Sequence, residues 1–282
     1  MIIDFHTHTF PEALAEHAIT KLSKSARAKN YLNGTVDALC SSMRASGIDY
    51  SVLLPVVTRP EQQTTINRTA LAINEKYNEN GLIPFGGMHP DNEDYRHILC
   101  ELAKEGIKGI KLHPVFQKTN LDDIRYLRII ECACENDLIV LIHAGCDISY
   151  PKADYASVRR IVSVLETLKP DKFVLAHMGG WGCWNEVEQN IMGRKVYMDT
   201  SFSLLPILPA LGTTRNPQES PHLPKEQFLR MVQKHGANQI LFGTDSPWSG
   251  QKETLAFLKE SGLNKKDLSL ILGGNASELL QL

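Results

Sequence analysis

The sequence lacks long apolar segments and a strong charge of either sign. Nowhere among its 282 residues does an apolar run approach the ~20 residues that a membrane-spanning helix needs. The net charge of −2 at pH 7 produces no field that would favour nucleic acid or an anionic membrane surface. We therefore expect neither a nucleic acid nor a membrane as partner.

The sequence also lacks the cysteine patterns of secreted and redox proteins. Its six cysteines form no Cys-x-x-Cys pair and no disulfide-scaffold spacing, which favours a reducing compartment. The N-terminus does not combine a basic segment with a short apolar core, so we expect no signal peptide. Together these absences predict a cytoplasmic protein.

The composition that is present is ordinary for a globular protein, with 43% hydrophobic and 22% charged residues. A chain of 282 residues is long for an average domain, but α/β barrels reach this size as one unit. No linker, low-complexity tract or internal repeat divides the sequence. We therefore predict a single domain over residues 1–282.

Short apolar runs alternate with longer amphipathic segments from one end of the chain to the other, which predicts parallel βα units. Strands are predicted over residues 2–5, 50–57, 82–88, 107–112, 138–142, 172–176, 195–198 and 239–242. Helices are predicted over residues 11–28, 36–46, 61–80, 91–105, 121–136, 154–168, 184–192 and 225–235. Two further helices end the chain, and Asn275 with Glu278 resembles a capping box at the start of the last one.

Eight parallel strands are the number that closes a barrel with a packed interior. The alternative is an open, doubly wound sheet, but no Gly-x-Gly-x-x-Gly motif follows the first strand. The predicted fold class is therefore α/β, a (β/α)8 TIM barrel.

Polar side chains follow almost every predicted strand, and in a closed barrel the C-terminal strand ends meet on one face. His6 and His8 stand two residues apart, so on a strand they point the same way and supply half of a metal site. The polar residues at the other strand ends are His89, Lys111, His113, His143, His177, Asp199 and Asp245.

His6, His8, His143 and Asp245 offer three imidazoles and one carboxylate for a divalent metal ion. This set suits Zn²⁺, our first choice, or Mn, Fe, Co or Ni, and not Ca²⁺ or Mg²⁺. A lone histidine at a strand end is more often structural, and the recurrence of the pattern is what favours a metal site. Asp245 is also the candidate general base for a metal-activated water; the alternative is an Asx-turn or helix cap before Ser-Pro.

Two residues keep more than one interpretation. His177 is either a ligand of a second metal or a free catalytic acid or electrophile. Lys111 is a buried lysine paired with a carboxylate, an anchor for an anionic substrate, or a carboxylated bridge between two metals. His89 and His113, each followed by proline, are interpreted as mainly structural.

The remaining candidates surround this centre. We expect Asp199 and Ser201 to orient ligating histidines by accepting their second ring N–H. Trp181, Trp184 and Trp248 follow strand ends and either line a substrate pocket or pack the loops. Cys146 and Cys183 are near the same mouth, and we predict no nucleophilic role for them because no partner base can be assigned.

The combined motifs resemble the metal-dependent amidohydrolase superfamily, and within it the amidohydrolase-related branch that includes aminocarboxymuconate semialdehyde decarboxylase and resorcylate decarboxylase. The segments that carry this resemblance are Asp4-Phe5-His6-Thr7-His8, Lys111-Leu112-His113-Pro114, His143-Ala144-Gly145, His177-Met178-Gly179-Gly180 and Gly243-Thr244-Asp245-Ser246-Pro247-Trp248.

The resemblance implies a distorted barrel whose single metal is held by His6, His8, His143 and Asp245, with His177 as the free catalytic residue. In binuclear relatives a carboxylated lysine bridges two metals and the sixth-strand histidine binds the second, so Lys111 and His177 leave the metal count open. Decarboxylases of the branch often have a glutamate in the first-strand pair or an arginine that grips the substrate carboxylate. Here the pair is His-x-His, and the candidate grips are Arg59 and Arg215.

Three functions remain from the sequence. The first is a metal-dependent hydrolase that opens a C–N or C–O bond of a small amide, lactone or ester. The alternative is a metal-dependent, non-oxidative decarboxylase of a small unsaturated or aromatic acid. The third is a barrel that binds a metal or metabolite without turnover. We expect a small-molecule substrate in the enzyme cases, and we leave a homodimer open.

Overall fold

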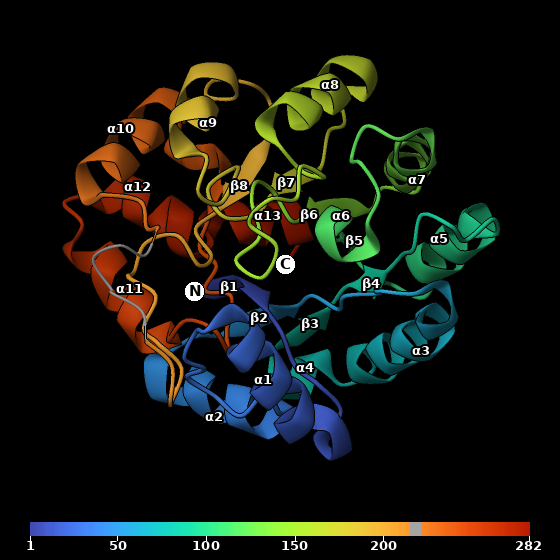
Figure 1. The fold of residues 1–282 in the computed structure, drawn as a ribbon, viewed down its shortest axis with the longest axis horizontal. Helices are drawn as coiled ribbons and strands as arrows, with labels where there is room; N and C mark the ends of the chain where they lie inside the picture. Colours follow the sequence, from blue (N-terminus) through green and yellow to red (C-terminus); the bar gives the residue numbers. More distant parts are fainter. Residues whose placement is uncertain (215–220) are drawn as a thin grey trace.

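A computed structural model describes residues 1–214 and 221–282, and within these residues nine short strands form two parallel sheets. The first sheet contains β1 (Ile3–Thr7), β2 (Tyr50–Leu53) and β3 (Leu82–Pro84). The second contains β4 (Gly86–Gly87), β5 (Gly109–Leu112), β6 (Ile139–Ile142), β7 (Phe173–Leu175), β8 (Tyr197–Asp199) and β9 (Ile240–Leu241). Figure 1 shows the helices arranged as a ring around these strands.

The two sheets join into one closed barrel with eight strand positions. β3 and β4 are consecutive pieces of one extended segment, interrupted at Phe85, whose N–H still donates to the Leu53 carbonyl at 2.9 Å. On the other side β9 meets β1, because the Phe5 N–H donates to the Phe242 carbonyl at 2.7 Å. The predicted (β/α)8 TIM barrel is confirmed.

The helices follow the predicted alternation. Their bounds are α1 (Glu12–Ala26), α2 (Val36–Ser46), the short η1 (Pro60–Gln62), α3 (Gln63–Asn74), α4 (Tyr77–Asn80), α5 (Tyr95–Lys104), α6 (Pro114–Gln117), α7 (Ile124–Glu135), α8 (Val158–Leu168), α9 (Trp184–Asn190), α10 (Lys225–His235), η3 (Ala237–Gln239), α11 (Gln251–Glu260), α12 (Lys265–Ser269), η4 (Leu270–Gly274) and α13 (Asn275–Leu280). The α2 bounds agree with the prediction, since Thr35 Oγ1 accepts from the Ala38 N–H and Gly47 ends the helix at φ 69°.

Two helix predictions are wrong. The helix expected over 61–80 breaks after Asn74, whose side-chain amide donates to the Glu105 carbonyl at 3.3 Å. Asn275 is not a cap, because α12, η4 and α13 follow one another without a gap and Asn264 caps the start. The buried Asn275 amide instead donates to the Ala237 and Ile240 carbonyls, both at 2.7 Å, and fastens the helix to β9.

The core has two layers. Alternate residues of the strands, such as Ile139 and Leu141 of β6, fill the barrel together with Phe5 and Phe85, whose rings meet edge to face at 5.9 Å. α13 adds Ala276, Leu279 and Leu280 to this inner cluster. A larger cluster lies between the strands and the helices. Every second residue of β6 faces the barrel interior, and His143 is the next residue in this series after Ile139 and Leu141. The apolar interior of the barrel is therefore followed by a polar site at the C-terminal ends of the strands.

No helix in the part of the chain that the structure describes is both long and apolar enough to cross a membrane.

Candidate metal centre

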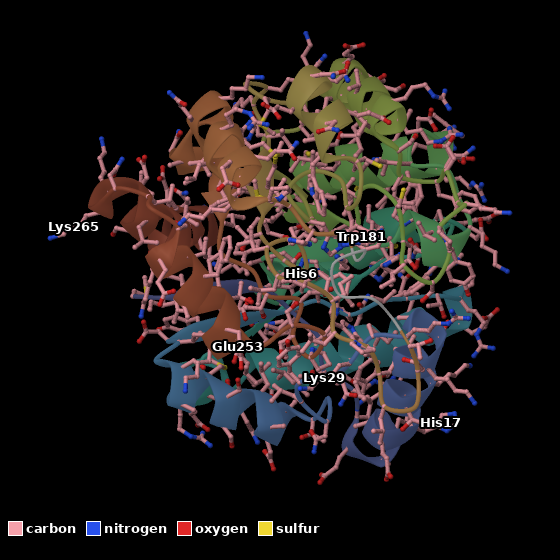
Figure 2. The ribbon with its side chains drawn as sticks, turned by 60° about the vertical axis from the view of Figure 1, so that its left-hand side comes forward. His6, His17, Lys29, Trp181, Glu253 and Lys265 are labelled. Carbon is pink, nitrogen blue, oxygen red and sulfur yellow. The ribbon has the colours of Figure 1, made fainter. Side chains whose placement is uncertain are left out.

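Closure of the barrel brings the C-terminal ends of its first and last strands together. His6 belongs to β1, and Asp245 follows β9. The Asp245 N–H donates to the His6 carbonyl at 2.8 Å, and the His8 N–H donates to the Ser246 carbonyl at 2.7 Å. Figure 2 shows His6 in the middle of the molecule, far from the peripheral helix end marked by Lys265.

Three side-chain atoms form a compact triangle at this junction. His6 Nε2 lies 3.2 Å from His8 Nε2 and 3.4 Å from Asp245 Oδ1, and His8 Nε2 lies 3.0 Å from Asp245 Oδ1. Atoms bound about 2.1 Å from one transition-metal ion, at angles of roughly 90–110°, are about 3.0–3.4 Å apart. The triangle therefore has the edge lengths of one face of a metal coordination sphere.

The hydrogen bonds behind the triangle decide which ring nitrogens carry protons. His8 Nδ1 lies 2.6 Å from the Leu54 carbonyl, which can only accept, so this nitrogen is protonated and Nε2 presents a lone pair. His6 Nδ1 lies 2.7 Å from Asp199 Oδ2, which fixes the same tautomer. Two imidazole lone pairs and a carboxylate oxygen thus face one another, and a cation between them removes their repulsion. The donor set fits a divalent metal.

Asp199 and Ser201 occupy the orienting positions expected for them. Asp199 Oδ1 accepts from the backbone N–H groups of His177 and Ser201, both at 3.0 Å. Ser201 Oγ lies 3.0 Å from His6 Nδ1 and 2.9 Å from His177 Nδ1. One small polar cluster therefore positions histidines from two different strands.

Asp245 and His177 have left-handed backbones, with φ of 65° and 61°. Such a conformation is strained for a residue with a side chain and is concentrated at functional sites. The Asp245 carboxylate faces His8 and not its own turn, which argues against the Asx-turn interpretation. Burial raises the pKa of this carboxyl, but the adjacent imidazoles of His8, His6 and His177, when protonated in the absence of a metal ion, outweigh burial and hold the pKa below its usual value.

Lys111 projects from β5 to the same point. Its side chain is almost wholly buried, and Nζ lies 3.3 Å from His6 Nε2. Burial lowers the pKa of Lys111 to about 8, and the carboxylates of Asp199 and Asp245 oppose this shift. The amine is therefore placed to touch anything bound at the triangle.

His143 belongs to a neighbouring set of side chains. Its Nδ1 lies 3.1 Å from His177 Nε2, and its Nε2 lies 3.0 Å from the Cys146 carbonyl. A second group of potential ligand atoms, all within 4.8 Å of one another, contains His143, His113 and Asp147. Of the four ligands predicted from the sequence, the structure thus brings three together and places His143 one ring further away, beside His177.

Asp147 is the residue that the sequence interpretation missed. It lies in the loop after β6, and its Oδ2 is 3.9 Å from His113 Nε2 and 4.0 Å from His143 Nε2. Burial raises the pKa of Asp147 to about 6. The sequence feature that could have identified Asp147 is its position four residues after His143, which ends a predicted strand.

The two histidines interpreted as structural differ. His89 Nδ1 accepts from the Asp91 N–H at 3.2 Å, and the His89 side chain is absent from the wall of the cavity described below. His113 Nδ1 accepts from the Phe116 N–H at 3.3 Å, which caps α6. The His113 ring also stacks on the His143 ring at 4.2 Å and lies in the cavity wall, so its position serves the site as well.

A cavity of about 330 Å³ opens over these groups. Trp181 and Trp248 line it as predicted, whereas the Trp184 indole N–H donates to the His177 carbonyl at 3.0 Å. Arg59 is not among the lining residues, although Thr58 beside it is, and Arg215 lies outside the described residues. The apolar lining residues are Phe10, Pro11, Leu22, Ala26, Ala28, Leu54, Pro55, Val56, Ile66, Phe116, Ile148, Trp181, Phe202 and Trp248.

The fold and the site together define a (β/α)8 barrel with a candidate divalent-metal site at the C-terminal ends of the strands. The chain belongs to the amidohydrolase family, whose sequence model matches residues 3–282. No curated protein sequence matches it.

Solved structures with the same fold cover the chain from end to end. An uncharacterised TIM-barrel protein from Bordetella bronchiseptica is 18% identical with a TM-score of 0.76, covering 99% of this chain and 98% of its own. A dihydroxybenzoic acid decarboxylase from a Polaromonas species, with bound manganese and the inhibitor 2-nitroresorcinol, is 14% identical with a TM-score of 0.72 over 100% and 97%. A probable 2-pyrone-4,6-dicarboxylic acid hydrolase from Acinetobacter baumannii, with citric acid bound, is 16% identical with a TM-score of 0.66 over 100% and 99%. At these identities the likeness is one of fold.

Proposed function

We propose that this protein is a metal-dependent carboxy-lyase that releases CO₂ from a small unsaturated or aromatic acid without oxidation. The observation that carries the proposal is the lining of the cavity, in which mostly apolar side chains meet one polar cluster of His6, His8, Lys111, His113, His143, Asp147, His177 and Asp245. Among the described lining residues, none is an arginine. Such a cavity suits a molecule with one anionic group at the polar cluster and an apolar body.

The metal is assigned to His6, His8 and Asp245, with His143 as the fourth ligand that the family resemblance implies. When bound, a divalent cation supplies positive charge that holds a substrate carboxylate and withdraws electron density from its carbon. Imidazole nitrogens and carboxylate oxygens bind zinc as well as manganese. Zinc remains our prediction from the sequence. The manganese of the Polaromonas decarboxylase supports a divalent metal of this group.

Lys111 is the second positive group, besides the metal ion, that would hold the substrate carboxylate. Its Nζ lies beside the triangle in a buried setting, where the attraction between opposite charges is stronger than in water. The apolar walls disfavour a localised charge on the rest of the molecule. As CO₂ leaves, the electron pair of the broken C–C bond stays on the substrate carbon, spreads into the unsaturated system and is taken up by a proton.

His177 delivers the proton to the vacated carbon. Its Nδ1 lies 3.0 Å from the Ser201 carbonyl, which fixes one ring proton there and leaves Nε2 as the nitrogen that exchanges protons. His143 Nδ1 lies 3.1 Å from that nitrogen, so the two imidazole rings face each other. The aromatic rings of Phe116, Trp181 and Phe202 offer flat surfaces for the ring of a substrate.

The test is a panel of small aromatic and unsaturated monocarboxylic acids given to protein loaded with Zn²⁺ or Mn²⁺. The proposal expects CO₂ in the headspace and, in ²H₂O, one deuterium at the carbon that lost the carboxylate. If no acid releases CO₂ while lactones or esters in a parallel panel are opened, the carboxy-lyase assignment is wrong.

Hydrolysis of a lactone or ester is the second candidate, and the placement of Asp245 favours it. A carboxylate at the edge of the metal site can take a proton from an attacking water and return it to the leaving group. The probable 2-pyrone-4,6-dicarboxylic acid hydrolase from Acinetobacter baumannii, which has the same fold, also supports this candidate. Reaction in H₂¹⁸O separates the two candidates, because only hydrolysis places ¹⁸O in the product acid.

A further inference from the structure

Two cysteines from different loops touch at the rim of the cavity. Cys146 follows β6, Cys183 precedes α9, and their Sγ atoms are 3.6 Å apart. Both residues are free thiols of intermediate exposure, and Cys146 lines the cavity itself. All six cysteines lie in the described residues, and no other Sγ–Sγ contact is found among them.

The backbone already joins these two loops. The Cys146 N–H donates to the Trp181 carbonyl at 3.0 Å, and the Trp181 N–H donates to the Ala144 carbonyl at 2.9 Å. Gly145 permits this approach, because a Cβ on it would lie 2.4 Å from the Trp181 nitrogen. The loops are therefore held in register independently of the two sulfur atoms.

We propose that Cys146 and Cys183 form an oxidation site, where a peroxide oxidises the two thiols to a disulfide. This bond would link the loop that follows β6 to the loop that follows β7 at the edge of the cavity. The sulfur atoms must approach by about 1.5 Å to reach the ~2.05 Å of an S–S bond. Side-chain rotation can supply much of that movement, since the backbones are already hydrogen-bonded to each other.

The reaction balances with hydrogen peroxide as the oxidant. The Cys146 thiolate attacks one peroxide oxygen, the O–O bond breaks, and the products are a Cys146 sulfenic acid and hydroxide. The Cys183 sulfur then attacks the Cys146 sulfur, the S–O bond breaks, and the thiol proton leaves with the hydroxyl as water. Two thiols lose two electrons in total, and one peroxide gains them.

The clamp acts on the chemistry through His143. The Cys146 carbonyl lies 3.0 Å from His143 Nε2. A displacement of Cys146 on disulfide formation therefore moves the carbonyl that holds the His143 ring. On the other loop, the residue after Cys183 is Trp184, whose indole N–H holds the His177 carbonyl. Oxidation therefore restrains both of the loops that carry His143 and His177.

The experiment treats the metal-loaded protein with one equivalent of hydrogen peroxide and maps the cysteines by differential alkylation and mass spectrometry. The expected result is one peptide pair linked through Cys146 and Cys183, released by dithiothreitol, with a rise in melting temperature of about 5 °C. Cys183→Ser should lose the linkage and the shift, and dimedone should then trap Cys146 as the sulfenic acid. Cys183→Ala serves as a second variant if the serine form does not fold.

Cys40→Ser is the matched control, because Cys40 lies on α2 on another side of the barrel, and it should keep both the linkage and the shift. The proposal is overturned if the wild-type protein keeps both thiols at this dose. It is also overturned if the thiols are oxidised separately to sulfinic acids, without a linked pair. Neither readout depends on which reaction the enzyme catalyses.

Discussion

His6 Nδ1 and Asp199 Oδ2 lie 2.7 Å apart, although 193 positions separate the two residues in the sequence. Asp199 is fully buried at the end of β8, and His6 is on β1. The contact orients the imidazole so that its other nitrogen faces His8 and Asp245. A carboxylate outside the ligand set thereby decides the geometry of the metal site.

Asp199→Asn should weaken metal binding by about 10–100-fold, because an amide can donate to His6 Nδ1 and favour the wrong tautomer. Titration with Zn²⁺ against a competing chelator measures the change. Asp171→Asn is the control, since Asp171 pairs with Lys195 on the exposed surface, and its metal affinity should match the wild type. An unchanged affinity in Asp199→Asn would remove the orienting role.

His177→Asn should lower kcat by about 10²–10⁴-fold, the range expected for loss of a general acid. Metal content should stay at the wild-type value, because His177 lies outside the triangle and its Nδ1 is held by Ser201. Plasma emission spectroscopy of the purified variant gives the metal-to-protein ratio. Loss of one metal equivalent would instead make His177 a ligand of a second ion.

Lys111→Met should abolish most of the turnover while metal affinity is kept or improved. The ammonium group repels a cation bound beside His6, and its removal leaves an apolar side chain of similar length in a buried position. We expect kcat/KM to fall at least about 100-fold, the effect of losing a buried charge on the substrate. Lys104→Met, on the exposed surface of α5, should have the wild-type kcat/KM. Normal turnover in Lys111→Met would contradict the anchoring role.

The acid stability of the protein should depend on Glu188, which joins α9 to α10. Its carboxylate accepts two hydrogen bonds from Arg230, both at 3.1 Å, and Lys234 lies 3.3 Å away. Arg230 first and Lys234 second lower the pKa of Glu188 from 4.5 to about 2. Because the folded-state pKa is depressed, this stabilisation is complete above pH 4.5 and is lost as the pH falls toward 2.

Glu188→Gln tests this dependence. The partner side chains are about half exposed, so solvent screening limits the loss to about 1 kcal/mol at pH 7. Urea unfolding at pH 7 and at pH 3 should give a difference from wild type that shrinks at the lower pH. A difference that is the same at both pH values would show that charge is not its cause.

Much of the fold was predictable because its signals are local. An apolar run such as 138–142 followed by a histidine marks a buried parallel strand and its C-terminal end, and eight βα units favour a closed barrel over an open sheet. The same periodicity predicted that His6 and His8 share a face. Three of the four proposed ligands meet because β9 pairs with β1, which the eight-strand count already implied.

The parts that were missed depend on contacts between distant segments. The interruption at Phe85 and the end of α3 at Asn74 are set by packing against neighbouring units. Asp147 joins the site only because the β6 loop folds back over the barrel mouth. His143 follows its strand as predicted, but its distance from the triangle is decided by its contacts with His177 and the Cys146 carbonyl.

We expect His6 Nε2, His8 Nε2 and Asp245 Oδ1 to bind one divalent metal ion. A crystal of the metal-loaded protein, measured at the X-ray absorption edge of the added metal, locates that ion by its anomalous signal. The expected result is a peak within about 2.3 Å of all three atoms. A peak found only among His113, His143 and Asp147, or no peak in protein that retains its metal, would contradict it.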